Sequence, residues 1–153
     1  MSHLKSTTHK LKQMQTLATV KKEENILAVQ NAFQDFLKGN IAGIQNICAD
    51  DITWGAYSHP AVPYSKTYHG KKGVGEFFAT LAATTDYKRF EPREFFADGD
   101  AVIVRGYHEA VVKSTGKTFG HDFMMHFRMK EGEVVYFFAF VDINDQANAF
   151  ATN

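Results

Sequence analysis

Apolar residues in the first third of the chain recur every three or four positions, which is the spacing of an amphipathic helix. One such stripe predicts a long helix over residues 24–38 that ends at Gly39-Asn40, and Asn40 can cap a second, short helix over residues 41–47. A later stripe predicts a third helix around residues 74–81. The apolar positions of the three helices are Ile26, Val29, Phe33, Phe36 and Leu37; Ile41, Ile44 and Ile47; and Val74, Phe77, Phe78 and Leu81.

After the third helix the apolar period changes to two, which is typical of β-strands. Four strands are predicted, at Tyr87–Ala97, Ala101–Lys113, Thr118–Met129 and Glu133–Asp142, joined by short turns that contain glycine. An earlier strand covers residues 52–57, and a long loop with two prolines follows it. Asp142 can cap a last short helical turn over residues 144–150. Helices followed by an antiparallel meander predict an α+β fold.

The totals are compatible with one domain in a reducing compartment. A chain of 153 residues without internal repeats fits a single domain. Cys48 is the only cysteine, so no intramolecular disulfide can form, and we expect a cytoplasmic protein. No apolar run reaches the roughly 18 residues of a membrane span, so we expect no membrane partner.

Charge is distributed unevenly along the chain. Residues 1–22 contain five lysines and no acid, whereas residues 23–153 contain 12 bases and 17 acids, a net charge of −5. An acidic body predicts no nucleic-acid partner. The basic start has some features of an organellar transit peptide but lacks arginine. The spacing of Leu11, Met14 and Leu17 favours a helical N-terminal extension to a single domain over residues 23–153.

Three segments together carry a resemblance to a known family. The run from Phe36 to Ile44, the run Cys48-Ala-Asp-Asp-Ile-Thr-Trp54 and the run from Tyr68 to Phe78 resemble the NTF2-like superfamily, and within it the SnoaL-like and ketosteroid-isomerase-related branch. The similarity covers residues 24–151. It implies a cone: a curved antiparallel sheet wrapped around a long N-terminal helix, with two further short helices, an apolar pocket and a dimer through the outer sheet face. Family members include isomerases, cyclases, hydrolases, dehydratases and binding modules.

The resemblance also implies catalytic positions, and they are vacant in this chain. The base of ketosteroid isomerase falls at or beside Ala56, its tyrosine at or next to Ala32-Phe33, and its oxyanion-hole acid at about Met125. Polyketide cyclases of this branch carry an acid at about the same Met125 position. Alanine and methionine have no proton to move. We therefore expect no ketosteroid isomerase activity, and the cyclase mechanism is disfavoured.

His121 is the candidate catalytic residue. It shares strand parity with an apolar row that should face the cavity, namely Phe119, Phe123, Met125 and Phe127. An unpartnered buried imidazole costs about 1–3 kcal/mol, so it should find a side chain, a water or the ligand. Desolvation favours the neutral ring, which can act as a general base. The alternative is a core histidine satisfied by a neighbouring hydroxyl.

Further pocket candidates surround this row. Trp54 has the parity of Ala56 and can orient a ligand through its indole N–H, unless it only fills the core. The tyrosines on or near the long loop can donate hydrogen bonds at the pocket mouth, unless they decorate the surface. The predicted pocket residues are Trp54, Tyr57, Tyr64, Tyr68, Phe78, Phe123, Met125 and Phe127. Arg105, Tyr107 and Glu109 share one face of the strand over residues 101–113. We expect that face to point outward, because the other face of this strand is more apolar. The alternative is an inward face, on which Arg105 can hold a carboxylate ligand through two hydrogen bonds.

Metal and cofactor motifs are missing. The seven histidines include no helical His-Glu-x-x-His pattern and have no cysteine partners. His121 and Asp122 are neighbours on a strand and point to opposite faces, so one ion cannot join them. The sequence has neither a dinucleotide-binding glycine motif nor a phosphate-binding loop. We expect no metal and no cofactor.

The sequence supports a small-molecule-pocket protein of SnoaL-like type. One interpretation is an isomerase, cyclase or lyase that acts on a small, mostly apolar, oxygen-bearing molecule. The alternatives are a non-catalytic ligand-binding domain and a dimeric association module. Tyr136, Phe138 and Phe140 form an aromatic row on the outer sheet face, which predicts a homodimer.

Overall fold

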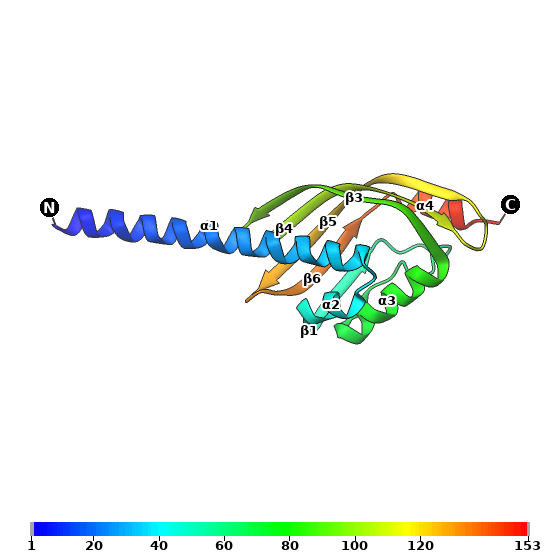
Figure 1. Cartoon of the computed structure of the whole chain (residues 1–153), viewed down its shortest axis with the longest axis horizontal. Coiled ribbons are helices and arrows are strands. Elements are labelled where there is room, and N and C mark those ends of the chain that lie inside the picture. Colours follow the sequence, from blue (N-terminus) through cyan, green and yellow to red (C-terminus); the bar gives the residue numbers. More distant parts are fainter. Residues whose placement is uncertain (1, 153) are drawn as a thin grey trace.

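The computed structural model describes residues 2–152, with only the backbone at Ser2. It is an α+β fold in which a curved sheet wraps around the C-terminal part of a long helix (Figure 1). The helices are α1 (Ser2–Leu37), α2 (Ile41–Ile47), α3 (Gly70–Thr84) and α4 (Ile143–Phe150). The strands are β1 (Cys48–Ala56), β2 (Tyr68–His69), β3 (Thr85–Asp98), β4 (Ala101–Val112), β5 (Thr118–Lys130) and β6 (Glu133–Phe140).

The six strands form one sheet in the order β2-β1-β6-β5-β4-β3. Strands β3 to β6 are the predicted antiparallel meander. The expected antiparallel sheet has one exception, because β1 pairs with β6 in parallel. Helix α3 separates β2 from β3 in the chain, so the meander starts at the far edge and its last strand returns beside β1. The alternation of apolar and polar residues along a strand does not show whether the neighbouring strand runs parallel or antiparallel to it.

Several element ends differ from those predicted. Strand β1 begins at Cys48 rather than at Ile52, because Cys48 already pairs with Val134 of β6 before a bulge. Strand β6 ends at Phe140, and the Asp142 side chain then accepts a hydrogen bond from the Asp145 backbone N–H at 3.0 Å. That cap begins α4, which is the predicted last helical turn and makes a third helix after α1, beside the two short helices that the resemblance implied.

The core lies between the inner face of the sheet and helices α1 and α3. The ring of Phe33 on α1 is at its centre, with its centroid 5.8 Å from that of Phe90, 5.9 Å from that of Phe95 and 6.1 Å from that of Phe127. Burial of one such ring is worth about 1.5–3 kcal/mol. This aromatic packing holds α1 across the inner face of the sheet.

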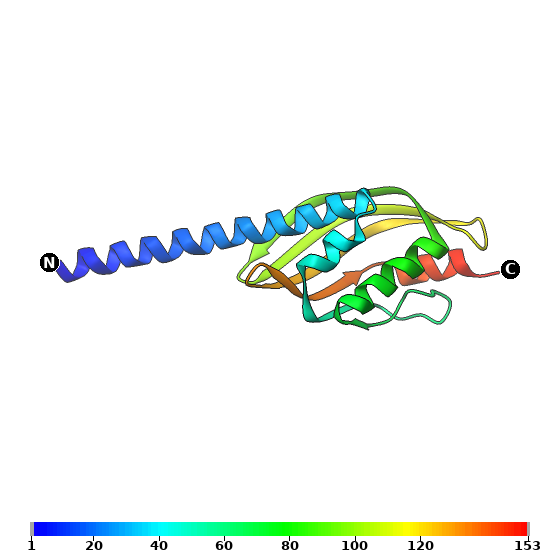
Figure 2. The ribbon, with the colours of Figure 1, turned by 60° about the horizontal axis from the view of Figure 1, so that its bottom comes forward.

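The N-terminal part of α1 projects from the body of the molecule (Figures 1 and 2). Its apolar side chains at Leu4, Leu11 and Leu17 are exposed. Where the helix reaches the sheet, the Lys22 ammonium lies 3.4 Å from the Asp98 carboxylate. Among the described residues, no helix combines the length and the apolar composition that crossing a membrane requires.

Candidate functional site

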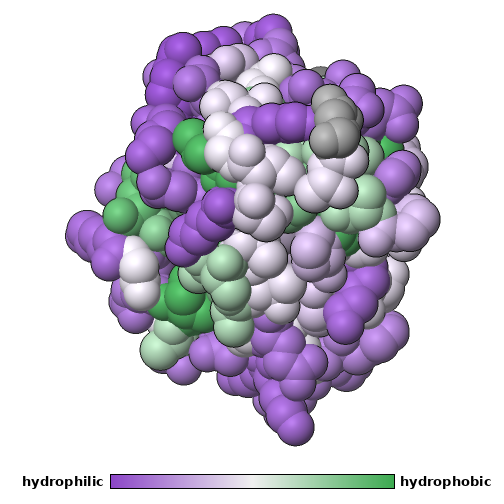
Figure 3. Space-filling view, turned by 90° about the vertical axis from the view of Figure 1, so that its right-hand side faces the viewer, coloured by the Kyte–Doolittle hydropathy of each residue, from purple (hydrophilic) through white to green (hydrophobic). Residues whose placement is uncertain are grey.

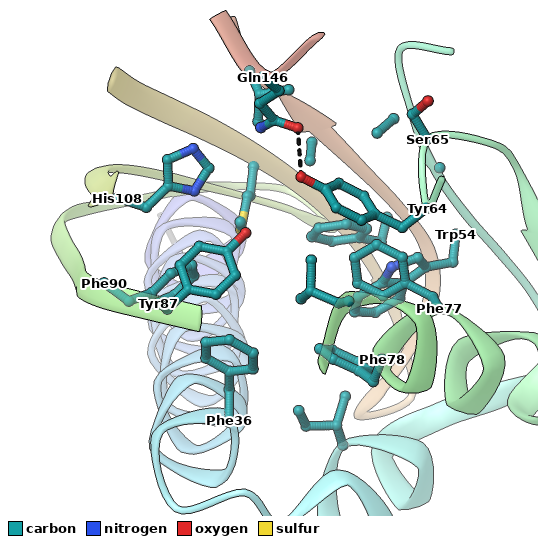
Figure 4. A pocket seen from close by; sticks show the side chains of 18 of the residues that line it. Phe36, Trp54, Tyr64, Ser65, Phe77, Phe78, Tyr87, Phe90, His108 and Gln146 are labelled. Carbon is teal, nitrogen blue, oxygen red and sulfur yellow. Dashed lines mark hydrogen bonds between the residues drawn. The ribbon is translucent and has the colours of Figure 1, made fainter. Parts of the chain in front are cut away.

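A cavity lies inside the cone, between the curved sheet, the end of α1, helix α3 and helix α4 (Figure 4). Its volume is about 90 Å³. Aromatic and aliphatic side chains dominate its wall, and Lys66, which is exposed, marks the place where it reaches the surface. The lining residues are Ala32, Phe33, Phe36, Ile44, Trp54, Gly55, Ala56, Tyr64, Ser65, Lys66, Phe77, Phe78, Leu81, Tyr87, Phe90, His108, Met125, Phe127, Phe137, Ala139, Val141, Ile143 and Gln146.

Ring-to-ring packing holds the apolar wall in place. The indole of Trp54 stacks on Phe137 with centroids 3.9 Å apart, and it makes an edge contact with Phe78, with centroids 5.6 Å apart. Seen from the end of the molecule that carries the C-terminus, the surface is mostly hydrophilic with small separate apolar patches (Figure 3). Most of the aromatic lining residues are buried, so a ligand among them would lose its contact with water.

Two polar groups at the α4 side of the cavity satisfy each other. The hydroxyl of Tyr64 donates to Gln146 Oε1 at 2.9 Å, and both side chains are buried (Figure 4). Burial raises the pKa of Tyr64, and burial also raises that of Tyr87 across the cavity. Both phenols therefore stay protonated at neutral pH and can act as hydrogen-bond donors.

His108 is the most unusual polar group of the cavity wall. The residue is 2% exposed, its ring lies beside Tyr87, and its Nδ1 is buried without a hydrogen-bond partner in the described structure (Figure 4). Its Nε2 lies 2.8 Å from Nε2 of His121, the residue directly opposite on β5. Burial, and to a lesser extent the nearby His121, lowers the pKa of His108 to about 3. His108 is therefore neutral in ordinary conditions.

Behind His108, a second histidine is tied to α4. His121 Nδ1 lies 2.8 Å from Asp145 Oδ2, and the same oxygen accepts a hydrogen bond from the Gly120 backbone N–H at 3.1 Å. The Gln146 amide nitrogen approaches His121 Nε2 to 3.4 Å. Asp142 caps this helix at its N-terminus, and Asp145 and Gln146 both contact the start of β5.

The structure brings together five of the predicted pocket residues. The predicted residues that line the cavity are Trp54, Tyr64, Phe78, Met125 and Phe127. Phe123 lies under the wall, where its ring stacks on Phe90 at 5.2 Å, and Tyr68 is buried with its hydroxyl donating to the Tyr64 carbonyl at 3.2 Å. Tyr57 lies on the outer face instead, edge-on to Phe138 at 5.2 Å, because strand alternation turns it away from Ala56.

His121, the predicted catalytic residue, faces inward but does not line the cavity. His108 stands between it and the space inside the cone. The positions that a steroid isomerase would fill with acids, at Ala32, Ala56 and Met125, do line the cavity, and no carboxylate is among the described lining residues. Arg105 points outward as expected, 3.4 Å from both Glu94 and Asp122.

Sequence reasoning missed His108, Asp145, Gln146 and Tyr87. One available signal was the parity of His108, which it shares with the buried Val104, Ala110 and Val112 of the same strand. No comparable signal in the sequence assigned Asp145 and Gln146 of α4 to the site, because only folding brings this helix next to β5. Within residues 2–152, no three side chains of metal-ligating type gather closely enough to hold an ion.

Comparison with known proteins agrees with this architecture. The family model of the SnoaL-like domain matches residues 29–137. An NTF2-like protein from Burkholderia xenovorans is 25% identical, with 85% of this chain and 98% of that chain covered and a TM-score of 0.78. The structure of TerC co-crystallised with polyporic acid is also 25% identical, with 84% and 99% covered and a TM-score of 0.75.

A more distant structure shows the fold alone. An LEH-like epoxide hydrolase from M. tuberculosis is 12% identical, with 85% of this chain and 91% of that chain covered and a TM-score of 0.67. None of the curated proteins matches the sequence. Because the domain model covers well over half of the chain, this protein belongs to the SnoaL-like family of the NTF2-like superfamily.

Proposed function

We propose that this protein binds a small, mostly apolar, oxygen-bearing molecule in the cavity and moves a proton on it, as an isomerase, cyclase or lyase does. The observation that carries the proposal is His108 Nδ1, a buried nitrogen without a partner in a residue of the cavity wall. Buried polar atoms in native proteins are nearly always hydrogen-bonded. A hydroxyl or an acidic C–H of a bound molecule would supply the partner.

The comparisons support a small-molecule role in general terms. Structures of the same fold carry the names polyketide cyclase, epoxide hydrolase and isomerase, and TerC was crystallised with polyporic acid. Those activities rest on residues that differ between members of one fold. The proposal for this chain therefore rests on its own cavity, in which the reacting group is a histidine rather than a carboxylate.

The size of the cavity limits the ligand. An engineered protein cavity of about 150 Å³ takes up benzene, and the space here is about 90 Å³. A single ring fits only if it extends toward the mouth at Lys66 or if Met125, a flexible side chain, moves aside. We therefore expect a ligand of about one ring, with its polar hydrogen at the His108 end.

Binding can be tested with three single-ring probes: phenol, benzaldehyde and cyclohexanone. Amide shifts in NMR spectra of the full chain should change around the cavity. Ala56→Leu fills the cavity and should weaken binding by roughly tenfold or more, since one or two methylenes are worth about 1–3 kcal/mol in a tight pocket. Tyr57→Phe is the matched control, because the adjacent residue faces outward, and it should change nothing. Shifts confined to the outer face would contradict the proposal.

Catalysis can be separated from binding with cyclohexanone in D₂O. Removal of a proton beside the carbonyl lets deuterium replace it, which NMR follows directly. We expect exchange faster than in buffer with the wild-type protein and no acceleration with His108→Phe, which keeps the bulk and removes the base. Binding without accelerated exchange would favour a non-catalytic ligand-binding domain.

We also propose that the protein is a homodimer. The rings of Tyr57, Phe138 and Phe140 contact one another on the outer sheet face, and Tyr57 is 46% and Phe140 44% exposed. Met124, 47% exposed, pairs with Phe140 across the strands and extends this cluster. A continuous apolar surface of this kind fits a protein partner, and a second copy is the simplest one.

A further inference from the structure

Three side chains form a line from the cavity to the surface: His108, His121 and Asp145. His108 Nε2 lies 2.8 Å from His121 Nε2, and His121 Nδ1 lies 2.8 Å from Asp145 Oδ2. Exposure rises along the line, since the His108 residue is 2% exposed while the side chains of His121 and Asp145 are 10% and 36% exposed. The inner end is therefore dry and the outer end reaches water.

The neighbouring hydrogen bonds decide which ring nitrogens carry protons. The Asp145 carboxylate can only accept a hydrogen bond, so the ring proton of a neutral His121 is on Nδ1, 2.8 Å from Asp145 Oδ2. His121 Nε2 then carries a lone pair. The Gln146 amide fits this arrangement, because its nitrogen, a donor, faces that lone pair at 3.4 Å while its oxygen accepts from the Tyr64 hydroxyl.

The same reasoning extends to His108. Of the two facing nitrogens, one must donate, and His121 Nε2 is the acceptor. His108 Nε2 therefore carries the proton, and its Nδ1 carries the lone pair at the cavity wall. Burial keeps the ring neutral and so leaves that lone pair free. The chain as folded is set to receive a proton from inside the cavity.

We propose that His108, His121 and Asp145 form a proton relay that takes a proton from a molecule in the cavity and leaves the positive charge on His121, beside Asp145. This rests on the proposed function, because a ligand must first bind. The X–H bond of the ligand breaks, its electron pair stays on X, and the proton joins His108 Nδ1. His108 gives its Nε2 proton to His121 Nε2. The products are an anionic ligand, neutral His108 and an imidazolium at His121 paired with the Asp145 carboxylate.

The relay explains how a buried, weakly basic histidine can act as a base. A charge held on His108 would lie in a dry, apolar environment, which disfavours it. Transfer to His121 places the charge next to a carboxylate that is partly in water. The relay also selects a substrate class: molecules with a weakly acidic proton at one end, such as phenols, enols or carbonyl compounds with an adjacent C–H.

The first test measures the protons directly and needs no ligand. Nitrogen-15 NMR of the histidine rings in the full chain distinguishes protonated from unprotonated ring nitrogens. We expect the proton on Nε2 in His108 and on Nδ1 in His121 at neutral pH. A proton on Nδ1 of His108 would overturn the relay, because no lone pair would then face the cavity.

The second test uses 4-nitrophenol, whose absorbance distinguishes phenol from phenolate. At a pH at which free nitrophenol is mostly protonated, we expect the wild-type protein to bind it as phenolate. Asp145→Asn should still bind it but lower the bound phenolate-to-phenol ratio roughly tenfold or more, since a neighbouring opposite charge shifts a protonation equilibrium by about one to three pH units. Asp122→Asn is the control: this carboxylate neighbours His121 in sequence but is exposed on the outer face.

The outcomes separate the two proposals. Absence of nitrophenol binding counts against the proposed function, and the ring-proton measurement then still decides the relay. Binding as the neutral phenol, or an equal ratio in Asp145→Asn and wild type, refutes the relay while leaving small-molecule binding intact.

Discussion

At the scale of single residues, the site depends on His108, a buried histidine that the sequence did not single out. The residue chosen from the sequence, His121, is the second member of the line, and His108 is the one at the cavity wall. Both lie on inward faces of neighbouring strands. Strand parity identified the inward face correctly, but it could not show which of two opposing histidines is nearer to the space inside.

Burial of His108 predicts how stability depends on pH. Its pKa falls from 6.5 to about 3 on folding, so between these values the unfolded chain binds a proton that the folded chain does not. The free energy of unfolding should therefore fall as the pH drops below about 6.5, and His108 should contribute up to about 1.4 kcal/mol of this loss per pH unit. Urea unfolding at pH 7, 6 and 5 measures the slope.

His108→Phe isolates this effect, because the phenylalanine cannot take up a proton in either state. The free energy of unfolding of the wild type, minus that of the variant, should fall steadily as the pH falls. Parallel pH profiles for the two proteins would mean that His108 is protonated, or reaches water, in the folded chain.

At the scale of elements, the sequence predicted most helices and strands but not how α4 docks. The periods of apolar residues and the turn residues locate α2, α3 and the four meander strands within a few residues. The contact of α4 with β5 joins residues about 25 positions apart, as in the Gly120–Asp145 bond. Local pattern carries no information about such a contact, so Asp145 and Gln146 could not be assigned to the site in advance.

The N-terminal cap of α4 should affect the site as well as the stability of the chain, because α4 carries Asp145 and Gln146. Asp142→Ala removes the acceptor for the Asp145 backbone N–H and should cost about 1 kcal/mol of stability. It should also loosen the His121–Asp145 contact, which ring-nitrogen NMR would report.

Asn40→Ala is the matched control for this change. Asn40 caps α2 through the same kind of bond, to Gly43 N at 3.1 Å, but has no contact with the histidines. We expect a similar loss of unfolding free energy and unchanged histidine spectra. Equal effects of both variants on the spectra would argue that α4 does not position Asp145.

At the scale of the whole molecule, the cone follows from the order of elements and from the family resemblance, which the domain match confirmed. The cavity within it follows from neither alone. Its walls come from α1, α2, α3, the loop before β2, the sheet and α4, and whether space remains between them depends on how all of these pack together. Hence the sequence predicted a pocket and several of its wall residues, but not its small volume or its polar end.

The outer aromatic cluster predicts a dimer of about twice the 17.2 kDa chain mass in light scattering at micromolar concentration. Phe140→Lys places a charge within the cluster and should give a monomer. Phe96→Lys changes another exposed phenylalanine, on the edge strand β3, which two strands separate from β6, and should leave the dimer intact. A monomeric wild type would remove the dimer and leave this cluster for another partner.

The central claim is that the cavity holds a small molecule with its proton-bearing atom at His108. A crystal structure of the protein with 4-nitrophenol tests it most directly. We predict that the ring lies among Trp54, Phe78 and Met125, with its oxygen about 2.6–3.2 Å from His108 Nδ1. Nitrophenol bound with its phenol oxygen at the mouth near Lys66, or bound only outside the cavity, would contradict the account.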